Sequence, residues 1–579
     1  MNMPRKDRWP SAPAGGKGNA RLSSGDAVVL VGLVGLLYLG VRLAVRVPEV
    51  ITGPRIDLSA GALPWYALLS TLRMAAAYLL SLGFSLAYGY AAARSPRAEK
   101  SLLPILDVLQ SVPILSFLPV VVLFFLAFLP DRLALELGAV VLIFTSQAWN
   151  LTFSFYQSLK TVPSDMTAAA ATFRFSRWLR FRYVEVPFAA IGLIWNSMMS
   201  WAGGWFFLMA SETFNVGRRD FRLPGLGSYL QAAANSSNTP AIIWGVFTLV
   251  AVIVALDQFL WRPLLAWGRR FKVETVEQEE AASSWFYDML SRSLLLRRLQ
   301  ERVLEPAMAA VDEWLAGNGG NGAWSTPRWQ RLGRGAAIAL GAAGAVGAFY
   351  CGLRALFMLA TLGPADWARV ALGTLATMAR VATALAIALF WAVPVGVALG
   401  TSPRLARIVQ PLVQLLASIP ATALFPIVLL LLLEVPGGLN IAAVLLMLMG
   451  TQWYVLFNVI AGANAIPQDL KYTAATLGVR GALRWRILTL PAIFPYLITG
   501  MITASGGSWN ASIVAEYVNF GGQTRQSLGL GALISQSTDT ANYPLLLAAT
   551  VTMILVVVSF NRFLWRRLYR LAGERYRLE

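Results

Sequence analysis

The sequence contains no histidine and only one cysteine among its 579 residues. The absence of histidine excludes imidazole acid–base catalysis and histidine-ligated metal sites. The lone cysteine, Cys351, cannot form a disulfide within the chain. Charged residues are also scarce, at 13%, whereas soluble domains carry about 25%. These shortages argue against a histidine-dependent enzyme and against a disulfide-stabilised secreted domain.

Apolar sequence is what the chain has in abundance. Hydrophobic residues make up 57% of it, and the mean hydropathy is +0.59. A helix needs about 20 apolar residues to cross a bilayer, and stretches of that length recur along the chain. The 20 tryptophans suit aromatic belts at the two membrane interfaces. The composition predicts an all-α integral membrane protein in contact with lipid.

The charge that is present is mostly positive. Lysine and arginine number 48 against 29 acidic residues, a net charge of +19. On a soluble protein this excess would indicate nucleic acid binding. In a membrane protein it marks cytoplasmic loops, so we expect no nucleic acid partner. The polar tail before the first apolar stretch carries no apolar signal-peptide core, which predicts that the first span is retained.

A segment between the apolar stretches occurs twice. Residues 162–187 and 466–491 align without a gap at an offset of 304, and nine of the 26 positions are identical. Crossing a bilayer requires no such polar, arginine-rich pattern, so we predict that a soluble partner binds it. The shared residues include Pro163 and Pro467, Asp165 and Asp469, Ala170 and Ala474, Ala171 and Ala475, Arg180 and Arg484, and Arg182 and Arg486.

The repeat extends over most of the chain and predicts two parallel halves of six spans each. The first six lie near 27–46, 66–93, 104–129, 134–158, 187–211 and 241–262, and the second six near 335–360, 370–399, 405–433, 439–460, 490–514 and 544–565. An even number of spans per half places both chain ends on one side. The basic loops identify that side as the cytoplasm, and the duplicated segment faces it too.

The predicted domains follow from these spans. They are a cytoplasmic tail (1–26), a first repeat (27–267), a cytoplasmic linker (268–332) and a second repeat (333–579). In the linker, Trp285, Met289 and Leu296 fall at helical spacing, which predicts an amphipathic helix on the inner membrane surface. A structural role for this linker is favoured over a regulatory one.

Each copy of the duplicated segment has the signals of a short helix. Pro163 and Pro467 suit the first helical position, and the aspartate two residues later lies in the first turn, where the helix dipole favours a carboxylate. Gly478 breaks the second copy before its basic stretch, whereas the first copy has Arg174 at that place. We therefore expect the second copy to follow the docking geometry of such a partner-binding segment more closely than the first.

The second copy resembles the cytoplasmic signature of the permeases of binding-protein-dependent ATP-binding-cassette importers. That signature is Glu-Ala-Ala, three residues, Gly, nine residues, then Ile-x-Leu-Pro. The second copy keeps Ala474, Gly478, Leu490 and Pro491, and the first keeps Ala169, Ala170 and Pro187. The first copy departs at Ala168 and Arg174, which leaves open whether both halves transmit force equally. Glu212 and Glu516, each followed by a glycine-containing leucine-rich stretch, resemble the nitrate, taurine and bicarbonate branch.

This resemblance implies a type I importer-like fold and a set of partners. Two copies of an ATPase subunit would bind ATP and magnesium, and this chain would hold no cofactor and no metal. A periplasmic or lipid-anchored solute-binding protein would deliver the cargo, expected to be a small anion. The location would be the bacterial inner membrane, with both termini cytoplasmic. The implied ATPase-coupling residues are Pro163, Asp165, Ala169, Ala170, Ala171, Arg180, Arg182, Pro467, Asp469, Ala474, Ala475, Gly478, Arg484 and Arg486.

Two further groups of residues are candidates within and outside the membrane. Polar residues in spans are costly and tend to be functional, although small ones also serve helix packing and arginines also reach toward headgroups. The pathway candidates are Arg73, Asn196, Ser200, Trp205, Arg380, Ser505, Ser508, Trp509 and Asn510. The candidates for receptor docking, with a solvated loop as the alternative for the basic stretch, are Glu212, Arg218, Arg219, Arg222, Glu516 and Arg525.

Two other classes of protein remain as alternatives. A secondary active transporter also fits two parallel halves of six spans, but the spans lack convincing midplane carboxylates for coupling to an ion gradient. An enzyme acting on lipid is the third class, and no catalytic cluster supports it. Uptake that persists without ATP but with an ion gradient would favour the secondary transporter.

Overall fold

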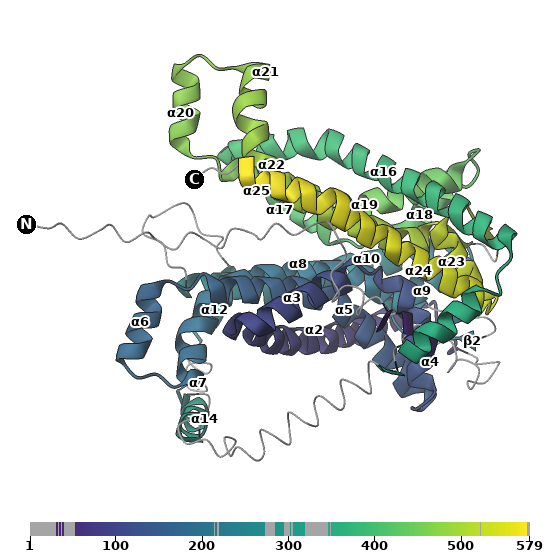
Figure 1. Cartoon of the computed structure of the whole chain (residues 1–579), viewed down its shortest axis with the longest axis horizontal. Helices are drawn as coiled ribbons and strands as arrows, with labels where there is room; N and C mark the ends of the chain where they lie inside the picture. Colours follow the sequence, from purple (N-terminus) through teal and green to yellow (C-terminus); the bar gives the residue numbers. More distant parts are fainter. Residues whose placement is uncertain are drawn as a thin grey trace, which may run out of the picture.

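The structure is a computed structural model built almost entirely from helices (Figure 1). It describes residues 53–271, 284–293, 305–318 and 349–575, with gaps at 214, 217–218 and 521–522, and single helical residues near 31–39, 301–302 and 346–347. The predicted all-α membrane fold is confirmed. Two short β-hairpins are the exceptions, formed by β1 (Asn215–Val216) with β2 (Arg219–Asp220) and by β3 (Tyr517–Phe520) with β4 (Gln523–Gln526).

Seven helices in the described residues are long and apolar enough to cross a membrane, or eight if one bent pair counts as a span. The sequence predicted twelve spans. Most of the predicted span near 27–46 lies outside the described residues. For the predicted span near 335–360, the structure describes an apolar helix at Phe349–Leu359. The seven run over Ala60–Arg94, Asp131–Lys160, Thr239–Gly268, Pro364–Thr401, Gly438–Asn464, Gly481–Ala515 and Tyr543–Ala572.

The two halves have the same order of elements, so the sequence repeat is also a structural one. The first half contains α2 (Leu63–Arg94), α3 (Pro96–Ser111), α4 (Leu118–Leu126), α5 (Asp131–Lys160), α6 (Ser164–Thr172), α7 (Arg177–Arg180), α8 (Val186–Glu212), α9 (Leu226–Asn235), α10 (Thr239–Leu256) and α11 (Arg262–Gly268). Their counterparts are α16 (Pro364–Thr401), α17 (Pro403–Ser418), α18 (Ala421–Leu432), α19 (Gly438–Asn464), α20 (Gln468–Thr476), α21 (Gly481–Arg484), α22 (Leu490–Ala515), α23 (Leu530–Asp539), α24 (Tyr543–Phe560) and α25 (Arg566–Arg575).

The third predicted span of each half is not one continuous helix, which corrects the sequence prediction. In the first half the chain is extended at Val112, just before Pro113, and resumes through a short 3₁₀ turn into α4. In the second half it is extended at Ile419, just before Pro420, and the flanking helices meet at 82°. The residue before a proline disfavours the α conformation, which explains both breaks.

A π-helical turn joins the duplicated segment to the following span in both halves. It comprises η3 (Phe181–Glu185) and η7 (Trp485–Thr489), and the helix then continues without a stop into α8 or α22. Pro187 and Pro491 lie at the second residue of those helices. A proline has no N–H for the regular helical hydrogen bond, so the helix accommodates it with a wider turn.

Each half packs around three long helices. In the first half α5 lies against α2 and α8, and in the second half α19 lies against α16 and α22. The two halves meet where α18 packs on α8 and α9. Hydrogen bonds among the described residues also join the halves: Leu115 N donates to Asn510 Oδ1 at 3.3 Å, and Gln231 Nε2 donates to the Asn519 carbonyl at 2.9 Å.

The described part of the linker contains two helices, α12 (Trp285–Ser291) and α14 (Glu305–Asn318). Of the predicted amphipathic helix, Trp285 and Met289 lie in α12, which ends at Ser291, and Leu296 lies outside the described residues. Trp285 packs against Phe259 of the first half. Helix α14 packs against α7, beside the duplicated segment (Figure 1).

Candidate functional site

The two copies of the duplicated segment form matching helical projections at one end of the molecule (Figure 1). Helix α6 is followed by α7 and η3, and α20 by α21 and η7, each element displaced by 304 residues. We call α6 with α7 and η3 the first coupling element, and α20 with α21 and η7 the second. Asp165 and Asp469 lie in the first turns, as predicted.

The prolines lie one position earlier than predicted. Pro163 and Pro467 occupy the N-cap positions, with ψ of 142° and 141°, and their helices begin at the following residue. The extended backbone of these prolines turns the chain from the preceding long helix into the short one. Both residues are exposed, as are Asp165 and Asp469.

Both short helices end in the same backbone motif. In the second copy Val479 N donates to the Ala474 carbonyl at 2.9 Å and Gly478 N to the Ala475 carbonyl at 3.1 Å. In the first copy Phe175 N and Arg174 N make the same bonds four and three residues back into α6, both at 3.0 Å. This is a Schellman ending, and its left-handed position is filled by Gly478 at φ 68° and by Arg174 at φ 52°.

The surfaces of the two short helices are mostly exposed. Ala169, Ala171, Ala475 and Gly478 face solvent, and Ala474 is half-buried. Ala170 is an exception, because it is 4% exposed and packs within the first half, so its predicted contact with an ATPase is not supported. Large apolar side chains at the helix ends are exposed, including Phe173 at 75% and Leu477 at 73%.

The repeated arginines have different surroundings in the two copies. Arg180 Nε lies 2.9 Å from Glu185 Oε1, and Arg182 pairs with Asp312 of the linker helix. Their counterparts Arg484 and Arg486 are exposed and have no carboxylate partner among the described residues. Thr489 takes the place of Glu185 in the second copy. Burial and the nearby charge of Arg484 lower the pKa of Lys471, which indicates a concentration of positive charge there.

Arg73 and Glu212 form a buried ion pair within the first half. Arg73 Nη1 lies 2.8 Å from Glu212 Oε1, and Arg73 also binds Glu136 with Nε and Nη2 at 2.6 and 2.7 Å. Glu212 accepts two more bonds, from Ser70 Oγ and from the backbone N–H of Gly227, both at 2.7 Å. These bonds tie α2 and α8 to the start of α9.

The second half repeats this pair with Arg380 and Glu516, 2.7 Å apart. Glu516 also accepts bonds from Thr377 and from the N–H groups of Gly531 and Ala532. A β-carbon on Gly529 would lie 2.0 Å from Glu516 Oε2, so only glycine allows this approach. Glu212 and Glu516 are fully buried, which contradicts their predicted contact with an outer receptor.

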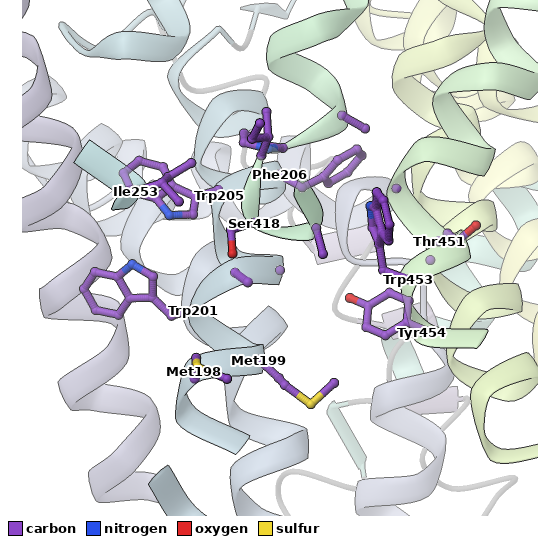
Figure 2. A pocket seen from close by; sticks show the side chains of 18 of the residues that line it. Met198, Met199, Trp201, Trp205, Phe206, Ile253, Ser418, Thr451, Trp453 and Tyr454 are labelled. Atoms are coloured by element: carbon purple, nitrogen blue, oxygen red, sulfur yellow. The ribbon is translucent and has the colours of Figure 1, made fainter. Parts of the chain in front are cut away.

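A cavity of about 150 Å³ lies between the halves (Figure 2). Its walls come from α8 and α10 of the first half and from α19, α22 and the break between α17 and α18 of the second. Figure 2 shows Trp201 and Trp205 on one side and Trp453 and Tyr454 on the other. Aromatic and methionine side chains line it together with small, aliphatic and a few polar residues, and Trp201 Nε1 has no hydrogen-bond partner among the described residues.

A second cavity of about 390 Å³ follows farther along the same helices. It is lined by later residues of α8 and α22, by α9, α18 and α23, and by β3. Its only cation among the described residues is Arg222, which pairs with Asp220, and its remaining acidic group, Asp539, accepts a 2.7 Å bond from Tyr517. Both cavities are lined by residues of the two halves.

The structure separates the predicted pathway residues into two groups. Trp205 and Asn510 line the first cavity. The other residues make contacts within their own half. Arg73 and Arg380 form the ion pairs described above, and Ser505 and Trp509 are buried in the core. Asn196 hydrogen-bonds within its own helix, Ser200 hydrogen-bonds to α5, and Ser508 hydrogen-bonds to Thr451. The sequence prediction missed Met198, Met199, Phe206, Tyr454 and Phe457, whose apolar character gives no local sign of a cavity.

The predicted docking loop is described only in part. Arg218 lies outside the described residues, Arg219 is in β2, and Arg222 is committed to Asp220. Arg525 is exposed on β4, where it donates a 2.8 Å bond to Gln523. Among the described side chains of the six predicted docking residues, Arg525 is therefore the one that is exposed and has no acidic partner in the described residues.

Comparison with known families places both halves in one family. The family model described as "Binding-protein-dependent transport system inner membrane component" matches residues 80–259 and again residues 392–571. The two matches cover both coupling elements, the long helices α5, α8, α19 and α22, and only the later parts of α2 and α16. Each match begins inside the first long helix of its half, α2 or α16.

Curated relatives are similar over part of the chain. The "Bicarbonate transport system permease protein CmpB" of Synechococcus elongatus is 33% identical over 148 residues, 26% of this chain and 52% of that protein. The "Nitrate import permease protein NrtB" of Synechocystis is 26% identical over 189 residues, 33% of this chain and 65% of that protein. The "Taurine transport system permease protein TauC" of Escherichia coli is 28% identical over 222 residues, 38% of this chain and 74% of that protein. The chain thus spans about half the length of the bicarbonate relative.

Proposed function

Because this chain belongs to the family of binding-protein-dependent transport system inner membrane components, we propose that it is the complete membrane pathway of an ATP-driven importer. Its two fused halves take the place of two separate permease copies. The cargo passes along their boundary, through the two cavities lined by α8, α18 and α22. ATP hydrolysis takes place on separate ATPase subunits, and this chain acts as no enzyme.

The observation that carries this proposal is the duplicated coupling element. Two exposed short helices with the same N-caps and the same Schellman endings project from one end of the molecule. After a turn of four residues, each is followed by α7 or α21, which continues through a π-helical turn into α8 or α22 without a stop. Both α8 and α22 line the cavities. A push on either short helix is therefore transmitted to the wall of the pathway.

The partners follow from this geometry. Two ATPase subunits bind the two coupling elements from the cytoplasm, with ATP and magnesium held between them. The chain would reside in the inner membrane of a bacterium, with both termini on the cytoplasmic side. A solute-binding protein docks on the opposite face, where Arg525 is exposed.

We propose a small anion as the cargo, in line with relatives named for bicarbonate, nitrate and taurine transport. The described residues that line the cavities offer it no unpaired cation, since Arg222 is bound to Asp220. Selection of the anion would then rest with the solute-binding protein. The permease provides a route with unpaired polar groups such as Trp201 Nε1 and Thr422 Oγ1.

Co-purification tests the coupling elements. The chain is purified from its native membranes, and any bound ATPase subunit is identified and quantified. Reversing the charges of Asp469 and Arg484 together should remove the ATPase, because both residues are exposed on the second coupling element. Reversing Asp131 and Arg132 together, at the start of α5, is the matched control and should leave the ATPase bound. An undiminished yield of ATPase with the Asp469 and Arg484 variant would refute the proposal.

A further inference from the structure

The linker helix α14 is attached to the first coupling element through one carboxylate. Asp312 accepts hydrogen bonds from Trp178 Nε1 at 2.8 Å and from the Tyr183 hydroxyl at 2.9 Å, and it forms an ion pair with Arg182. Arg182 Nη1 also donates to the Met308 carbonyl at 3.0 Å. A single side chain of the linker therefore contacts both α7 and η3.

The second coupling element lacks the residues for such an attachment. The repeat places Ala482 opposite Trp178 and Ile487 opposite Tyr183, and neither side chain can donate a hydrogen bond. Only the arginine is retained, as Arg486. Three donors converge on Asp312 in the first half, and one would remain in the second. The linker helix is thus specific for the first half.

The arginines of the two coupling elements also differ in their ion pairs. In the first, Arg180 faces Glu185 and Arg182 faces Asp312. In the second, Arg484 and Arg486 are exposed, and no carboxylate pairs with them among the described residues. Unpaired exposed arginines attract acidic surfaces, whereas arginines already in ion pairs do so weakly.

We propose that α14 acts as a clamp on the first coupling element and makes the two ATPase-docking sites unequal. The clamp holds α7 and η3 through Asp312 and neutralises Arg182. The second element keeps Arg484 and Arg486 available for an acidic surface on its ATPase subunit. Arg484 and Arg486 therefore contribute more to ATPase binding on the second half than Arg180 and Arg182 do on the first. The part of this inference that concerns ATPase binding rests on the proposed function; the clamp itself does not.

Hydrogen exchange on the full-length protein in detergent tests the clamp without any partner. Amides of 181–187 should be protected more than those of 485–491. The Asp312→Asn variant should speed exchange at 181–187 by about tenfold, because it removes a charge-assisted contact with three donors, and should leave 485–491 unchanged. The Glu313→Gln variant, which removes an exposed charge one residue later, is the matched control. Equal exchange in the wild type and Asp312→Asn, or an equal effect of Glu313→Gln, would overturn the clamp.

Binding of the ATPase subunit that co-purifies with the chain tests the inequality. Arg486→Gln should weaken this binding by about threefold to tenfold and reduce its salt dependence, whereas Arg182→Gln should change it less than twofold. Equal effects of the two substitutions would overturn the inequality. Loss of all ATPase binding in every form, with the exchange pattern intact, would contradict the proposed function and leave the clamp standing.

Discussion

Arg174 and Gly478 occupy the same left-handed backbone conformation, with φ of 52° and 68°, at the ends of two short helices 304 residues apart. The sequence suggested that an arginine at this place would alter the first coupling element. The structure shows the same Schellman hydrogen bonds in both copies. What distinguishes the two elements is the charge around their arginines and the contact with α14.

The left-handed conformation should make Arg174 costly. A residue with a β-carbon loses about 1–2 kcal/mol in this conformation, and glycine does not. We expect Arg174→Gly to stabilise the end of α6 by about 1 kcal/mol, and Gly478→Arg to destabilise the end of α20 by a similar amount. Hydrogen exchange at Arg174, Phe175, Gly478 and Val479 measures both. Stability changes of the opposite sign, or no change in either variant, would contradict the predicted backbone strain at Arg174.

The ion pair of Arg73 with Glu212 should be essential for stability. Removing one partner of a buried ion pair leaves a charge without compensation and costs about 3–5 kcal/mol. We expect Arg73→Met to lower the unfolding temperature strongly, and the double variant Arg73→Met/Glu212→Gln to recover part of it. Arg132→Met, at an exposed arginine, is the control. Thermal unfolding in detergent checks this, and an unfolding temperature of Arg73→Met equal to that of the control would contradict it.

Filling the first cavity should stop transport and leave ATPase binding intact. Gly203 lines this cavity, and a β-carbon there would lie 3.3 Å from the Tyr454 hydroxyl. We expect Gly203→Phe to reduce uptake to background while the ATPase still co-purifies. Gly83→Phe on the exposed face of α2, where a β-carbon meets no atom within 4 Å, is the control and should retain uptake. Normal uptake by Gly203→Phe would exclude this cavity from the pathway.

The contact of α14 should persist over the physiological pH range. Burial raises the pKa of Asp312, but hydrogen bonds from Trp178, Arg182 and Tyr183 outweigh it and leave this pKa below the ordinary 3.8. A lowered pKa means that the contact is fully stable above the ordinary value and is lost as the pH falls through the lowered one. The donors from η3 and α7 stay protonated there, and Glu305 and Glu313 are the acidic neighbours on α14 itself.

Protection of 181–187, corrected for the intrinsic exchange rate, is the measurement. We expect it to remain constant from about pH 8 to about pH 5 and to fall only in stronger acid. Protection that changes between about pH 6 and about pH 7 would show that a different group controls the contact.

The sequence predicts well what depends on neighbouring residues. Short helices at 164–172 and 468–476 follow from a proline and a first-turn aspartate in each copy, with Gly478 after the second helix. The same is true of the internal repeat, which reappears element by element. The breaks at Val112 and Ile419 were missed, although Pro113 and Pro420 carried a local signal for them.

Contacts between distant residues were not predicted. Arg73 and Glu212 are 139 positions apart, and Trp178 and Asp312 are 134 apart. A pattern within a helix gives no information on which distant charge faces it. One signal was present for the ion pairs: Arg73 and Glu212 recur as Arg380 and Glu516, and opposite charges that recur together within spans are expected to pair. No such recurrence exists for Asp312, which lies in the unrepeated linker.

The claim that two coupling elements transmit the energy of ATP to a pathway between the halves has one direct test. The chain and its co-purified subunits are reconstituted into proteoliposomes, and uptake of labelled nitrate, bicarbonate and taurine is followed with the receptor added outside. We expect uptake of at least one of these solutes that requires ATP on the side of the coupling elements and is unaffected by collapsing ion gradients. Uptake driven by an ion gradient in the absence of ATP would contradict it.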